Sequence, residues 1–130
     1  MKKILIDTNI YSAFKRNNLE IVKILKSVEY IGISTTVLGE IYSGFKLGKK
    51  HKQNCYELDL FLDTPRVHFL KLDETTAEIY ATVFKQLKTK GKPIPTNDIW
   101  ISATAIQYGL ALLTLDKHFE NIEGLLQHVS

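Results

Sequence analysis

Short apolar segments alternate along this chain with longer segments whose apolar residues recur every three or four positions. The short segments are typical of buried strands and cover 3–6, 30–34, 67–70 and 110–115, with a further short strand expected at 126–129. The longer segments predict helices, among them one that ends at Gly91 and one over 96–108 that ends at Gly109. This alternation favours an α/β fold, a three-layer α/β/α sandwich around a mostly parallel central sheet.

The length of 130 residues corresponds to one domain, which we expect to cover 1–130. The composition, 45% hydrophobic and 24% charged, is that of a globular protein and excludes a disordered or fibrous chain. A single cysteine, Cys55, excludes an internal disulfide. We expect a cytoplasmic protein with no membrane partner, because no apolar run is long enough for a signal peptide or a membrane span. The net charge of +3 permits a nucleic-acid partner without requiring one.

Four of the acidic residues stand where a parallel sheet would bring them together. Asp7 ends the first strand, Asp116 ends the strand near the C-terminus, and Asp98 lies in the first turn of the helix over 96–108. Glu40 lies in the first turns of the helix after the second strand, beside small residues that leave room for a ligand. A helix between parallel strands runs antiparallel to them, so its N-terminus meets the edge at which the strands end. The sequence therefore predicts four carboxylates at one edge.

Each of these residues also has an ordinary structural explanation. An aspartate after a strand often forms a turn, as Asp7 and Asp116 could. An aspartate in a first helical turn, such as Asp98, is favoured by the helix dipole. Glu40 lies off the apolar face of its helix and could simply be an exposed side chain. The prediction of a site depends on their convergence, not on any one position.

Clustered carboxylates repel one another unless a cation compensates them, and hard divalent cations such as Mg²⁺ and Mn²⁺ prefer carboxylate oxygens. Zinc has little support, because the four histidines form no paired ligand motif. We expect His118 to be a surface residue and not a general base. The chain also lacks the glycine-rich phosphate-binding motifs and the nucleophile elbow of serine hydrolases.

Four segments, in order, resemble the successive motifs of the PIN domain: ILIDTNIYSAF, TTVLGEIYSG, PIPTNDIWISATAIQYG and LLTLDKHFENIEGL. The likeness is greatest to VapC-type toxins of toxin–antitoxin pairs. It implies a Mg²⁺- or Mn²⁺-dependent endoribonuclease that cuts single-stranded or structured RNA, such as tRNA or rRNA. It also implies a homodimer that a cognate antitoxin holds inactive. The acidic quartet of the family falls on Asp7, Glu40, Asp98 and Asp116, and its supporting polar residues fall on Thr8, Asn9 and Thr114.

Two further features bear on an RNA substrate. The lysine-rich segment 46–52 could contact phosphates through Lys49, Lys50 and Lys52, or it could be an ordinary solvated surface. Trp100 lies in a helix with apolar residues on most of its circumference, so we expect this side chain in the core and not as a base-stacking platform.

Two other functions remain open at this point. The first is a non-catalytic PIN module that binds RNA or protein, against which the complete quartet counts. The second is a phosphotransfer or receiver domain with Asp7 as nucleophile, which would need a second aspartate beside Asp7 or a lysine at a strand end. The sequence offers neither.

Overall fold

The computed structural model describes residues 2–128. Its four strands are β1 (Lys3–Ile6), β2 (Tyr30–Ser34), β3 (Val67–Leu70) and β4 (Ala111–Leu113). Its helices are α1 (Thr8–Lys15), α2 (Leu19–Ser27), α3 (Thr35–Leu47), α4 (His51–Leu62), α5 (Glu74–Lys90) and α6 (Thr96–Tyr108), followed by the short 3₁₀ helix η1 (Lys117–Asn121).

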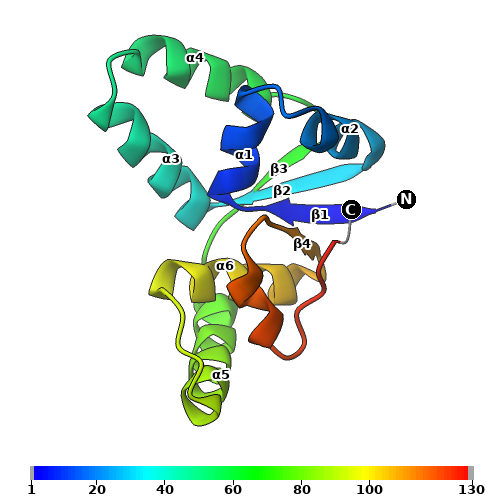
Figure 1. Cartoon of the computed structure of the whole chain (residues 1–130), viewed down its shortest axis with the longest axis vertical. Helices are drawn as coiled ribbons and strands as arrows, with labels where there is room; N and C mark the ends of the chain where they lie inside the picture. Colours follow the sequence, from blue (N-terminus) through cyan, green and yellow to red (C-terminus); the bar gives the residue numbers. More distant parts are fainter. Residues whose placement is uncertain (1, 129–130) are drawn as a thin grey trace.

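The strands form one parallel sheet in the order β3-β2-β1-β4, so β1 lies between β2 and β4. On β1, Leu5 pairs with Gly32 of β2 on one side and with Leu112 of β4 on the other. Figure 1 shows α1 to α4 on one side of this sheet and α5 and α6 on the other. The predicted three-layer α/β/α sandwich with a parallel sheet is confirmed.

The central strand β1 explains why the first apolar segment shows no alternation of apolar and polar residues. Ile4, Leu5 and Ile6 are fully buried, because helices cover both faces of the sheet. The core continues through the buried residues of β2 and β4 and of the surrounding helices. Among the described residues, no helix combines the length and the apolar character that crossing a membrane demands.

Most predicted bounds agree with the structure, and the C-terminal segment differs in an informative way. Strand β4 is shorter than the predicted 110–115, because the Thr114 hydroxyl accepts a hydrogen bond from the Asp116 backbone N–H (3.0 Å) and turns the chain. In the segment expected as a strand over 126–129, Gln127 makes one parallel bridge to Leu112, and residue 129 lies outside the described residues. Helix α1 has no counterpart among the predicted elements.

The two helices that matter most for the site begin at the same edge of the sheet. Helix α3 follows β2 without a connecting loop, and its first turn is capped by the Ser34 side chain, which accepts from the Val37 N–H (3.2 Å). Helix α6 ends as predicted at Gly109, whose left-handed backbone (φ 64°) turns the chain into β4. Their N-terminal turns therefore lie beside the C-terminal ends of β1 and β4.

Candidate active site

Asp7 is the buried carboxylate of this edge, with an exposed fraction of 5%. It directly follows β1 and caps α1, where its Oδ1 accepts from the Ile10 N–H (3.1 Å). Its Oδ2 accepts from the Thr114 hydroxyl, which connects the ends of β1 and β4. Burial raises the pKa of Asp7, and the negative charges of Asp98 and Asp116 add to this effect, while the two hydrogen bonds partly offset it. A nearby positive charge would favour the ionised form of this carboxylate.

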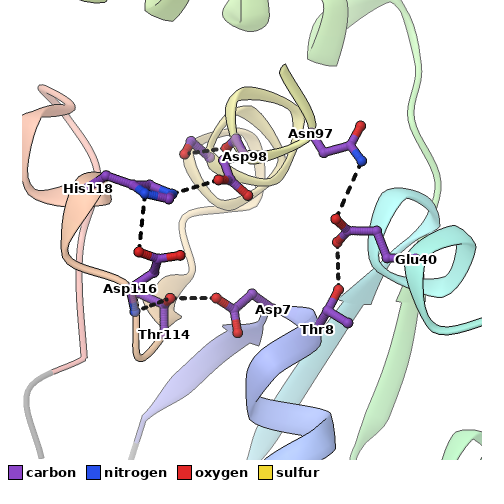
Figure 2. A network of polar contacts seen from close by, with 9 residues as sticks. Asp7, Thr8, Glu40, Asn97, Asp98, Thr114, Asp116 and His118 are labelled. Carbon is purple, nitrogen blue, oxygen red and sulfur yellow. Dashed lines mark hydrogen bonds and ion pairs between the residues drawn. The ribbon is translucent and has the colours of Figure 1, made fainter. Parts of the chain in front are cut away.

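Asp98 and Asp116 lie on either side of the His118 ring, as Figure 2 shows. The His118 Nε2 is 2.6 Å from Oδ2 of Asp98, and its Nδ1 is 3.1 Å from Oδ1 of Asp116. The Nε2 contact has hydrogen-bond geometry, and the Nδ1 contact is an ion pair when the imidazole is protonated. Burial raises the pKa of Asp98, His118 lowers it, and the charges of Glu40 and Asp116 raise it further. In its protonated form the imidazole would be a local counter-charge for two carboxylates.

Glu40 approaches the same space from α3, and its partners are neutral. Its Oε1 accepts from the Thr8 hydroxyl at 2.5 Å, and its Oε2 accepts from the Asn97 amide at 3.4 Å. Thr8 stands at the start of α1, and Asn97 in the first turn of α6. Three helices therefore fix the orientation of this one carboxylate, which faces the others across the site in Figure 2.

The structure brings Asp7, Glu40, Asp98 and Asp116 to one edge of the sheet, as the sequence predicts. Candidate ligand atoms of Asp98, Asp116 and His118 lie within 4.8 Å of one another. Carboxylate oxygens suit Mg²⁺ and Mn²⁺, and desolvation, with a smaller contribution from neighbouring carboxylates, raises the pKa of the buried Asp7 and the partly buried Asp98. The donor set therefore fits a hard divalent cation.

The expectation of an ordinary surface position for His118 is wrong, whereas its predicted lack of a general-base role stays a prediction. The 3₁₀ helix η1 folds back directly after Asp116 and places the His118 ring, half-buried, between two carboxylates. Its position two residues after a strand-ending aspartate was the available signal. Asn97 was also missed, although it directly precedes Asp98 and so had to lie at the same edge.

The predicted supporting residues divide into two groups. Thr8 and Thr114 donate hydrogen bonds to site carboxylates. Asn9 is exposed, and within residues 2–128 its side chain makes no hydrogen bond. Lys49, Lys50 and Lys52 are also exposed, beyond the C-terminal end of α3 and separated from Glu40 by at least about 10 Å of helix. Whether these lysines contact RNA stays a prediction.

Comparison with known proteins agrees with this geometry. The family model described as "PIN domain" matches residues 4–125. The chain is 33% identical over 130 residues to "Ribonuclease VapC2" of Rickettsia felis, covering 94% of this chain and 93% of that protein. It is 36% identical over 123 residues to "Toxin FitB" of Neisseria gonorrhoeae, covering 87% of each. A solved structure of VapBC2 from Rickettsia felis, bound to a DNA fragment from their promoter, superimposes with a TM-score of 0.88, at 28% identity and 96% coverage of both chains. The chain is a member of the PIN domain family.

Proposed function

We propose that this protein is a metal-dependent endoribonuclease and the toxin of a toxin–antitoxin pair. The observation that supports this most directly is the convergence of Asp7, Glu40, Asp98 and Asp116, from four separate segments, around one space. Like charges gathered in this way destabilise the metal-free protein, so their presence favours a function that needs them.

In this proposal Asp7, Asp98 and Asp116 hold the metal, directly or through water, and Glu40 completes a second metal position or orients the attacking water. When bound, Mg²⁺ or Mn²⁺ supplies Lewis acidity, which activates water and offsets the charge of the phosphodiester. Thr114 holds the Asp7 carboxylate, and Thr8 and Asn97 hold that of Glu40. His118 shares its two ring nitrogens between Asp98 and Asp116 and fixes their separation while the metal is absent.

The substrate and partner are inferred from the relatives. The protein named "Ribonuclease VapC2" is similar to 94% of this chain, which supports RNA as substrate, and "Toxin FitB" is similar to 87% of it, which supports a toxin. The VapBC2 complex from Rickettsia felis, which superimposes on 96% of this chain, supports a cognate antitoxin protein as partner. We further propose a homodimer in the cytoplasm, where both RNA and an antitoxin are available.

The products of the reaction test this mechanism. In-line attack by water with departure of the 3′ oxygen leaves a 5′-phosphate and a 3′-hydroxyl, and cleavage should stop when EDTA removes the metal. Mass spectrometry of the RNA ends distinguishes this route from attack by the ribose 2′-hydroxyl, which leaves a 2′,3′-cyclic phosphate. Cyclic phosphate from the metal-replete protein would overturn the mechanism.

A non-catalytic PIN module remains the competing function, and the same samples decide between the two. Such a module would bind RNA equally with and without metal and would leave every substrate intact. Expression in a bacterial host tests the toxin assignment separately, since the native chain should arrest growth and a variant without cleavage activity should not. Growth at the native rate, with active nuclease present, would retain the enzyme and reject the toxin.

A further inference from the structure

A shallow hollow of about 660 Å³ opens beside the carboxylates, between the N-terminal halves of α3 and α6. Glu40 and Asn97, which are hydrogen-bonded to each other, both line it. The hollow is therefore continuous with the site in Figure 2, yet it lies outside the group formed by Asp98, Asp116 and His118. One substrate molecule could therefore occupy this hollow and contact the carboxylates at the same time.

One wall of this hollow is the indole of Trp100. The sequence predicts this side chain in the core, but in the structure it is only half-buried. The Tyr80 ring packs against this indole with 4.2 Å between ring centroids and 31° between planes. Tyr80 comes from α5, so a neighbouring helix holds the orientation of Trp100. A large aromatic side chain is thus fixed in place and still reaches an open surface.

The opposite side of the hollow is formed by small and polar residues of α3. A Cβ atom placed on Gly39 would meet no heavy atom within 4 Å, which shows that the space in front of this glycine is open. The Ser43 hydroxyl donates to the Gly39 carbonyl at 2.8 Å, and its oxygen can still accept a hydrogen bond. Thr36 adds a further hydroxyl to the lining. An aromatic wall facing hydroxyl and amide groups matches the two ways in which proteins hold an unpaired base, stacking and edge hydrogen bonding.

We propose that Trp100 and the hollow beside Glu40 form a nucleobase subsite, which holds one unpaired base of the RNA next to the bond that is cut. This inference rests on the proposed ribonuclease function. It also explains why the substrate would have to be single-stranded at the site of cleavage. A base inside a duplex has both faces covered by its neighbours and cannot stack on the indole. Because Glu40 itself lines this hollow, a base held there would place its nucleotide beside the carboxylates.

The binding test compares three variants with the native protein. Trp100→Leu removes the aromatic ring, Trp100→Phe retains one, and Tyr108→Leu removes an exposed aromatic ring (40% exposed) at the far end of the same helix. The probe is a fluorescein-labelled ten-nucleotide oligoribonucleotide in a Ca²⁺ buffer, with a denaturing gel to verify that it stays intact. We expect Trp100→Leu to weaken binding roughly 5- to 100-fold, the range measured for loss of one stacked base. Tyr108→Leu should bind like the native protein, and Trp100→Phe should lie close to it.

Abasic substitution then identifies the stacked base. Each base of the probe is removed in turn, and one position should weaken binding by the native protein as much as Trp100→Leu does. In Trp100→Leu the same removal should have no further effect, because the two changes delete the same contact. Trp100 is the only tryptophan of the chain, so quenching of its fluorescence on binding of the intact probe gives a second, independent readout.

The outcomes separate the two proposals. If the native protein cuts RNA while Trp100→Leu binds and cuts equally well, the subsite is wrong and the ribonuclease stands. The subsite is also wrong if abasic positions weaken the native protein and Trp100→Leu by the same factor at every position. If the native protein neither binds nor cuts any RNA, both proposals fall. Circular dichroism of each variant verifies that the fold is retained.

Discussion

The two halves of the site hold their carboxylates in opposite ways. Asp98 and Asp116 share the His118 ring, which can carry a positive charge and bonds both carboxylates. Glu40 is held by a hydroxyl and an amide, which orient the carboxylate and offset none of its charge. A protonated His118 would partly compensate the first half, here called the compensated half, whereas the other half is only positioned.

This difference indicates that the two groups of carboxylates have different roles at one edge of the sheet. In the metal-free protein, a protonated His118 would screen the repulsion between the two carboxylates of the compensated half. The positioned half has a fixed direction and an uncompensated charge, which suits a group that acts on a water molecule or on a second metal. The following predictions test this division, from the largest expected effect to the smallest.

Removing one ligand charge should separate the two halves most clearly. Asp98→Asn should reduce RNA cleavage roughly 100-fold or more, because a lost metal ligand removes several kcal/mol of transition-state stabilisation. Glu40→Gln retains one oxygen that can accept a hydrogen bond and should cost less than Asp98→Asn does. Single-turnover cleavage assays measure both, with Asp59→Asn, an exposed aspartate on α4, as matched control. Equal losses for Asp98→Asn and Glu40→Gln would remove the distinction drawn above.

Metal should stabilise the folded protein, because the unfolded chain has no such cluster. At a free Mg²⁺ or Mn²⁺ concentration ~100 times the Kd, we expect the free energy of unfolding to rise by about 2.7 kcal/mol. Asp98→Asn should reduce this rise strongly, and Asp59→Asn should leave it unchanged. Thermal melts across a metal titration provide the measurement. A melting temperature of the native protein that does not change with metal concentration would contradict the proposed metal site.

Replacing the shared histidine tests the compensated half alone. His118→Asn removes the ring that carries a positive charge between Asp98 and Asp116 when protonated. At a pH where His118 is protonated, we expect the metal-free protein to lose about 1 kcal/mol of unfolding free energy, since the ring is partly solvent-exposed. With metal bound, the cation takes over this compensation, so the loss should shrink. Urea unfolding with and without Mg²⁺ measures both values. A loss that is the same in both conditions would show that His118 acts only through packing.

The smallest effect concerns the pH dependence set by Asp7. Burial raises its pKa above the ordinary value of 3.8, so the folded protein binds this proton more tightly than the unfolded chain does. The resulting stability is present at acidic pH and is lost as the pH rises through the raised pKa. Asp7→Asn can still accept from the Ile10 N–H and does not ionise. In metal-free buffer its stability advantage over the native protein should be greatest at neutral pH and should shrink toward pH 4. An advantage independent of pH would contradict this assignment.

The sequence predicts the fold better than it predicts contacts within the site. The apolar segments predict the strands, and Asp7 and Asp116 follow two of them. Because parallel strands all end at one edge of a sheet, the sequence predicts that both aspartates lie at that edge. The pairing of His118 with two carboxylates depends on the path of η1, for which periodicity carries no signal. The half-exposed position of Trp100 depends on the packing of α5 against α6, and a helix that is apolar on most sides does not reveal which side stays open.

The order of strands also determines when this protein can first act. Strand β1 is among the first segments to leave the ribosome, but its neighbour β4 is among the last, and the Thr114 hydroxyl that holds Asp7 lies 107 positions later in the chain. A nascent chain can pair β1, β2 and β3 early. It cannot gather Asp7, Asp98 and Asp116 until its C-terminal segment has emerged and docked. In the proposed function, a nascent chain without its C-terminal segment would therefore lack the complete carboxylate cluster and the activity that depends on it.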